Sequence, residues 1–174
     1  DWDSGRGGNV TDYSSPIGYH RGYTYETVGW NFKLPEANCA FGREQLKKIE
    51  SFKKERIKNW KYLKDGLKDI HQINISPMTD ESNPFGFCMT LKEGRNEFGM
   101  YLESQGIRHR PFFAGNILRH KPFSNLQSGF PDNFHVADHL MKNSLFIGCW
   151  NGMTKEMLNY IIEKIHAYFD NRHS

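Results

Sequence analysis

The stretch that most clearly decides the fold class is Phe85-Gly86-Phe87-Cys88-Met89-Thr90-Leu91. Large apolar residues occupy every second position, which is the period of a β-strand with one buried face. Downstream, residues 95–105 predict a helix that Gly106 ends, and residues 107–113 predict a second strand. We therefore expect helices and strands to alternate in the C-terminal half of the chain.

Toward the C-terminus, residues 114–131 are rich in Gly, Asn, Pro and Ser and predict a loop. A short helix is expected around residues 136–141, and a short strand over residues 144–149. Thr154 suits the cap of a final helix, whose apolar residues follow the i, i+3, i+4 rule: Met157, Leu158, Ile161, Ile162, Ile165, Tyr168 and Phe169. This order predicts a small sheet covered by helices, an α/β (α+β) domain over residues 71–174.

Upstream of the strand, the pattern indicates one long connecting helix over residues 35–70, bent near Gly42. Pro35 suits the first turn of a helix, and Glu36 suits its positive end. Apolar residues then recur at roughly helical spacing: Leu46, Ile49, Trp60, Leu63, Leu67 and Ile70. Residues 1–34 begin with a Gly-, Ser- and Tyr-rich stretch without periodicity, which predicts an irregular arm.

The composition excludes several classes of protein. The chain has 174 residues and a net charge of only +3, which gives no indication of nucleic-acid binding. The sequence contains no run of 18 apolar residues, so it predicts no membrane span. Three widely spaced cysteines and an opening unlike a secretory signal favour a cytoplasmic protein. Because the sequence does not begin with Met, we expect either a piece of a longer protein or a processed chain.

Three stretches carry a resemblance to a known family. The first is residues 29–46, Gly-Trp-Asn-Phe-Lys-Leu-Pro-Glu-Ala-Asn-Cys-Ala-Phe-Gly-Arg-Glu-Gln-Leu, and the second is residues 101–111, which end in Arg110-Pro111. Both resemble runs of the sugar aminotransferase/dehydratase family of fold-type I pyridoxal-phosphate enzymes. The third, residues 113–122, begins Phe-Ala-Gly-Asn and resembles a loop of the 4-keto-6-deoxysugar 3-dehydratase branch.

The resemblance implies the C-terminal small domain of a fold about twice as long. It implies a homodimer that uses pyridoxal or pyridoxamine 5'-phosphate, in which Asn31 and Lys33 reach the cofactor phosphate of the partner subunit. An amide and a cation near a helix start suit a phosphate. The alternative is that Asn31 is an ordinary turn residue and Lys33 a solvated lysine.

Other residues are candidates for binding a nucleotide-linked sugar. Arg110, Asn116 and Arg119 carry planar donors that suit a sugar hydroxyl or a diphosphate, although a loop held by its own hydrogen bonds is the alternative. Three aromatic or imidazole side chains of the arm would contact the neighbouring active site or pack on a surface: His20, Tyr23 and Tyr25.

The sequence predicts neither a metal site nor a catalytic base in this chain. His135 and His139 are four residues apart, but no third ligand has a clear spacing. Some 3-dehydratases of the family hold an iron–sulfur cluster with cysteines just before the arm, where this sequence has none. The lysine or histidine at the cofactor position would belong to a large domain outside residues 1–174.

Three hypotheses for function remain open. The first is part of a nucleotide-sugar 3-dehydratase, which residues 113–122 favour. The second is part of a nucleotide-sugar 4-aminotransferase, and the residue at the cofactor position would decide between them. The third is a non-catalytic dimerisation or binding module, because the isolated chain is expected to be inactive.

Overall fold

The computed structural model describes residues 35–79, 81–120 and 134–171. The chain divides into two compact units, residues 1–43 and 44–174. The described part of the first unit is Pro35 with most of helix α2 (Glu36–Leu46), a helix in which no residue is buried. Among the described residues, no helix combines the length and the hydropathy that crossing a bilayer requires.

The second unit is built on a four-stranded sheet with the strand order β1-β2-β4-β3, in which every neighbouring pair is antiparallel. The central strands are β2 (Gly86–Leu91) and β4 (Ser144–Gly148), paired with Phe87 opposite Ile147. The edges are β1 (Ile73–Ile75) and β3 (His109–Pro111). An antiparallel sheet can leave one face open while helices cover the other, and the described residues are arranged in this way.

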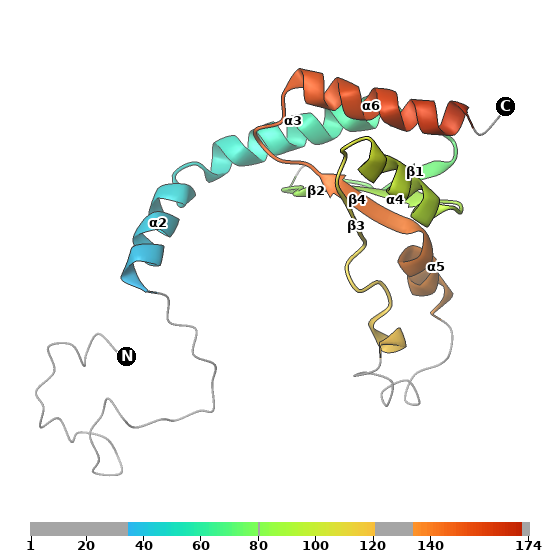
Figure 1. The fold of residues 1–174 in the computed structure, drawn as a ribbon. Helices are drawn as coiled ribbons and strands as arrows, with labels where there is room; N and C mark the ends of the chain where they lie inside the picture. The colour runs from blue at the N-terminus through green and yellow to red at the C-terminus, as the bar shows by residue number, and fades with distance from the viewer. Residues whose placement is uncertain (1–34, 80, 121–133, 172–174) are drawn as a thin grey trace, which may run out of the picture. The chain divides into compact units, whose positions relative to one another are not determined.

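Three helices cover one face of the sheet: α3 (Ile49–Leu67), α4 (Arg95–Ser104) and α6 (Lys155–Asp170) (Figure 1). The core lies between them and the inward residues of the central strands. Its fully buried side chains include Leu63, Leu67, Phe87, Met89, Phe98, Leu102, Leu145, Ile147 and Ile165. A short helix, α5 (His135–Asn143), leads directly into β4.

The local sequence explains the ends of these elements. Gly106 has a φ of +73°, and Ile107 returns a hydrogen bond of 2.8 Å to Leu102 O, so a glycine ends α4 as expected. The Thr154 side chain accepts a hydrogen bond from Met157 N and caps α6. The predicted fold class, a small sheet flanked by helices in an α/β (α+β) arrangement, is confirmed.

The single helix predicted over residues 35–70 is wrong in one respect, because it is interrupted. Helix α2 ends at Leu46 and α3 begins at Ile49, while Gly42 lies inside α2 without a break. Lys48 N bonds to Gln45 O, three residues back, which tightens and ends the turn. Leu46 is 64% exposed, so among the described residues the buried helix face does not continue across the break.

Two further details differ from the sequence prediction. Phe85 precedes β2 and is exposed, because its ring lies with Phe146 and Phe113 rather than in the core. Strand β1 was not predicted. It has three residues, too few for the Ile73–Ile75 alternation to stand out from a turn.

Candidate functional site

The candidate site is the turn that follows β3, together with the open face of the sheet beside it. After Pro111 the backbone reverses: Phe113 N bonds to Pro111 O at 2.7 Å, and Gly115 N bonds to Phe112 O at 3.0 Å. Phe113 has a φ of +49°, which is uncommon for a residue with a side chain. Gly115 also has positive φ, and a Cβ there would collide with Met141 of α5. The turn therefore packs directly on α5.

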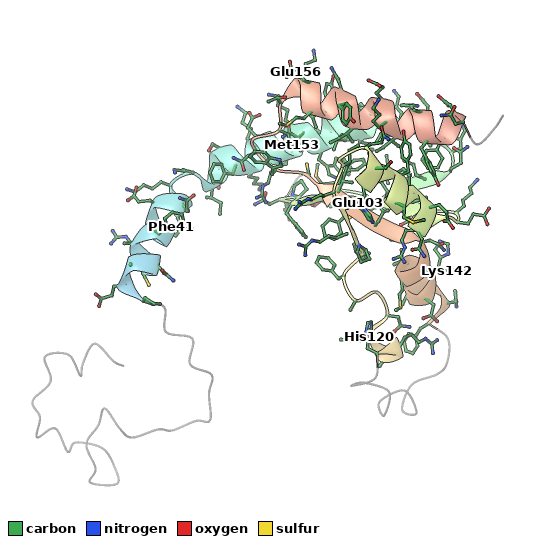
Figure 2. The ribbon with its side chains drawn as sticks, viewed as in Figure 1. Phe41, Glu103, His120, Lys142, Met153 and Glu156 are labelled. Carbon is green, nitrogen blue, oxygen red and sulfur yellow. The ribbon has the colours of Figure 1, made fainter. Side chains whose placement is uncertain are left out.

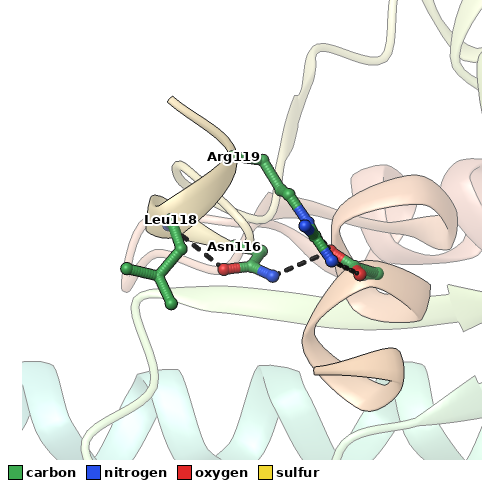
Figure 3. A network of polar contacts seen from close by, with 4 residues as sticks. Asn116, Leu118 and Arg119 are labelled. Atoms are coloured by element: carbon green, nitrogen blue, oxygen red, sulfur yellow. Dashed lines mark hydrogen bonds and ion pairs between the residues drawn. The ribbon is translucent and has the colours of Figure 1, made fainter. Parts of the chain in front are cut away.

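Asn116 is buried at the end of this turn, and both the oxygen and the nitrogen of its side-chain amide form hydrogen bonds. Its Oδ1 accepts a hydrogen bond from Leu118 N at 3.1 Å, which caps the 3-10 turn η2 (Ile117–Arg119). Its Nδ2 donates to Asp138 Oδ1 at 2.8 Å (Figure 3). Asn116 is only 4% exposed, so these bonds replace the water that its amide would otherwise bind.

Arg119 forms a two-point ion pair with the same carboxylate. Its Nε donates to Oδ1 of Asp138 at 3.0 Å, and its Nη2 donates to Oδ2 at 2.6 Å (Figure 3). The hydrogen bond from Arg119, followed by the one from Asn116, lowers the pKa of Asp138 to about 2. Asp138 is therefore ionised at neutral pH and accepts from both predicted binding residues.

Sequence reasoning did not single out Asp138. It lies 19 residues beyond Arg119 and 22 beyond Asn116, in the first turn of α5. A separation of that size follows no local rule, so the only signal in the sequence was an acid at the start of a helix. A further contact joins the end of the turn to its beginning, because the His120 ring lies 2.8 Å from Ala114 O (Figure 2).

Arg110 lies on the open face of the sheet, away from the Asn116–Asp138 network. It stands opposite Phe146 in the register of β3 and β4, and residues in such pairs share a face. It is exposed and has no hydrogen bond or ion pair within the described part of the chain. The rings of Phe85, Phe113 and Phe146 lie together on this face, with centroids 5.5–6.1 Å apart.

The structure thus distributes the predicted substrate residues over two places. Asn116 and Arg119 meet at Asp138, whereas Arg110 lies on β3, just before the turn, and has no hydrogen bond or ion pair with another described residue. The predicted arm residues lie outside the described residues, and their roles stay predictions: His20, Tyr23, Tyr25, Asn31 and Lys33.

Two other features of the described residues offer less for a sugar. A hollow of about 650 Å³ beside the start of α6 is lined mainly by apolar side chains, among them Ile107, Trp150 and Met157. The second feature is the imidazole of His139, whose Nδ1 lies 3.0 Å from Asn143 Nδ2. In the described ranges, no group of three or more His, Cys, Asp or Glu side chains could hold a metal ion.

The fold and these stretches define a class: the C-terminal small domain of a pyridoxal-phosphate-dependent transferase fold. The model of the DegT/DnrJ/EryC1/StrS aminotransferase family matches residues 12–166. The chain belongs to this family, which confirms the resemblance seen in its motifs.

Curated relatives include the lipopolysaccharide biosynthesis protein RfbH of Salmonella typhimurium, 34% identical over 90% of this chain and 37% of its own length. The GDP-4-keto-6-deoxy-D-mannose 3-dehydratase of Escherichia coli O55:H7 is 33% identical over 80% of this chain and 37% of its own length. The chain therefore spans little more than a third of these relatives.

Solved structures agree with this assignment. The E. coli GDP-4-keto-6-deoxy-D-mannose-3-dehydratase with bound hydrated PLP superposes with a TM-score of 0.73 at 30% identity, over 86% of this chain and 40% of that one. The aminotransferase TlmJ from Streptoalloteichus hindustanus reaches 0.75 at 12% identity over 87% of this chain and 41% of that one, which shows the fold alone.

Proposed function

We propose that this chain is the C-terminal part of a pyridoxal- or pyridoxamine-phosphate-dependent enzyme that removes the 3-hydroxyl group of a nucleotide-linked 4-keto-6-deoxysugar. The observation that carries the proposal is the stretch of residues 113–122, which resembles the 3-dehydratase loop and whose described part, residues 113–120, forms a turn beside the open sheet face. Relatives named as 3-dehydratases, 32–33% identical over 80–88% of the chain, support it.

The cofactor would be held in part by Asn31 and Lys33, acting on the partner subunit of a homodimer. An amide and an ammonium group have the donor chemistry that a phosphate ester requires. The cofactor supplies an electron sink for the chemistry at the sugar. The catalytic base would belong to the large domain, outside residues 1–174, so the isolated chain would bind and position without turnover.

On the substrate side, the described candidates are Arg110, Asn116 and Arg119, and of these Arg110 alone has no hydrogen bond or ion pair with another described residue. Its guanidinium is exposed and unpartnered among the described residues, so it has donors to offer a hydroxyl group or a diphosphate. Asn116 and Arg119 already donate to Asp138, and their contribution would come through the shape of the turn. His20, Tyr23 and Tyr25 would complete the site from the arm.

A second candidate is a nucleotide-sugar 4-aminotransferase. It is favoured by the dTDP-4-amino-4,6-dideoxy-D-glucose transaminase of Shigella dysenteriae, which is 28% identical over 83% of this chain and 41% of its own length. The two reactions share the keto sugar and the cofactor. They differ in whether the C3 hydroxyl group leaves or an amino group arrives at C4.

The deciding experiment incubates the full-length gene product with pyridoxamine phosphate, glutamate and a panel of nucleotide-linked 4-keto-6-deoxysugars, and follows the products by mass spectrometry. We expect a 3-deoxy sugar, one oxygen atom lighter than the substrate. A 4-amino sugar would overturn the dehydratase in favour of the aminotransferase. No product from any sugar, with no cofactor absorbance, would favour a binding module.

A further inference from the structure

We propose that Asp138 is a positioning residue, which clamps the turn after β3 through Asn116 and Arg119 and so sets where Phe113 and Arg110 meet a ligand. The inference rests on the proposed function for the identity of that ligand, a nucleotide-linked sugar. In this arrangement Asn116 and Arg119 hold the turn, and residues of the open sheet face contact the ligand.

The first step of the argument is the use of the carboxylate. Oδ1 of Asp138 accepts from both Asn116 and Arg119, and Oδ2 accepts from Arg119. One side chain of α5 therefore holds the residue before η2 and the last residue of η2. These are the two ends of a short turn, and fixing both leaves it little freedom to rotate.

The second step is the difference in burial between the two bonds. The side chains of the Arg119–Asp138 pair are 33% and 37% exposed, so water screens this ion pair. Asn116 is 4% exposed, and loss of its acceptor would leave a buried amide donor unsatisfied. The bond from Asn116 therefore contributes more to the clamp than the ion pair does.

The third step connects the clamp to the sheet face. Gly115 packs against Met141 of α5, and Phe113, two residues earlier, has the uncommon positive φ. The Phe113 ring contacts Phe146, and Arg110 stands opposite Phe146 in the sheet. A rotation of the turn would move Phe113 relative to Arg110, because Arg110 is fixed in the sheet and Phe113 is not.

The test compares the full-length wild-type protein with Asp138→Asn, Asp138→Leu, Arg119→Met and the double variant Asp138→Leu/Arg119→Met. The Asn side chain keeps one oxygen acceptor, whereas the Leu side chain, which is of similar size, keeps none. The effect should therefore be smaller in Asp138→Asn than in Asp138→Leu. Asp65→Asn is the matched control, because Asp65 is an exposed carboxylate of α3 without an ion pair among the described residues.

The first readout is amide hydrogen exchange, which requires no substrate. We expect exchange in residues 113–120 to accelerate about tenfold or more in Asp138→Leu and less in Asp138→Asn, while β4 and α6 keep wild-type protection. Unchanged exchange in this turn would overturn the clamp, whether or not the protein acts on any sugar. If Asp138→Leu does not fold, Arg119→Met should still accelerate exchange in the same residues.

The second readout is kinetic and separates positioning from mere stability. With the accepted sugar, KM should rise about tenfold in Asp138→Leu while kcat changes less than about twofold. This pattern is expected when a variant loses binding energy that the ground state and the transition state share. The loss in the double variant should be smaller than the sum of the two single losses, because Arg119 and Asp138 share the ion pair. Additive losses, or a loss of kcat alone, would refute the positioning role. Failure of every sugar would count against the proposed function only, since the exchange readout decides the clamp.

Discussion

Ile162 of α6 occupies the space that a Cβ atom on Gly66 of α3 would need. One turn further along α6, the His166 ring lies 2.8 Å from Gly66 O, and Tyr62 of α3 donates to Asn159 Oδ1 at 2.6 Å. The glycine thus permits the close approach of two of the helices that cover the sheet. Their burial of Leu63 and Ile165 depends on that approach.

Replacing Gly66 with Val should therefore destabilise the protein. Added carbons would meet Ile162 in a packed interface, and overpacking typically costs about 1–3 kcal/mol. The free energy of unfolding in urea would measure the loss.

Gly42→Val provides the matched control, since a Cβ at Gly42 of α2 has nothing within 4 Å. We expect this change to alter stability by less than about 0.5 kcal/mol. Equal losses at the two glycines would mean that the close packing of α3 on α6 is not the cause.

The pKa of Asp138 predicts a specific acid sensitivity. Hydrogen bonds from Arg119 and Asn116 lower this pKa to about 2 in the folded protein, against about 3.9 for an unfolded Asp. A group with a depressed folded pKa stabilises the fold above its unfolded pKa and loses that contribution as the pH falls through its folded pKa. Stability should therefore fall from about pH 4 to about pH 2 in the wild-type protein.

Asp138→Asn removes the titrating group, so the variant should lack this part of the pH dependence and be less stable than wild type mainly above pH 4. Unfolding curves at pH 5, 4, 3 and 2 would reveal the difference, and NMR titration of the carboxyl carbon would give the pKa directly. A titration midpoint near 4 in the folded protein would contradict the hydrogen bonds at Asp138.

Long periodic elements could be predicted from the sequence, whereas short ones could not. Helix α6 was predicted because Leu158, Ile161 and Ile165 follow the spacing of one helix face and Thr154 precedes them. Strand β1 was missed because three residues display no period. The break between α2 and α3 was missed because the apolar spacing continues across it, and only the structure shows that Leu46 and Ile49 are exposed among the described residues.

The candidate site could also be predicted only in part. Asn116 and Arg119 were found from their residue types and their motif, but the sequence could not say what they bond to. Their acceptor, Asp138, becomes a neighbour only when α5 packs on the turn. Phe85 illustrates the same limit, since strand alternation placed it in the core, and contacts with Phe113 and Phe146 hold it on the other face.

The cysteines should differ in reactivity. Burial raises the pKa of Cys149 to about 11, with the Arg56 charge opposing, and its Sγ donates to Arg56 O at 3.5 Å. At pH 8 roughly a thousandth of such a thiol is thiolate, which is the reactive form. Alkylation of the native chain followed by peptide mass spectrometry should label the exposed Cys39 first and Cys149 last.

Cys88 is half-buried and burial also raises its pKa, so it should react between the other two. In denaturant all three should react alike, which controls for the reagent. Native labelling of Cys149 as fast as Cys39 would show that the core around β4 opens readily.

The start of α6 depends on one hydroxyl group. Thr154 has extended backbone angles, and its side chain accepts a hydrogen bond from Met157 N at 3.3 Å, satisfying a donor that has no partner inside the helix. Thr154→Ala should cost about 0.5–2 kcal/mol, whereas Thr154→Ser keeps the hydroxyl and should cost much less. Because Leu158 follows one turn later in the core, fraying of this end would expose apolar surface, and urea unfolding would report it. Similar stabilities for the Ala and Ser variants would mean that packing against α3 alone defines where α6 begins.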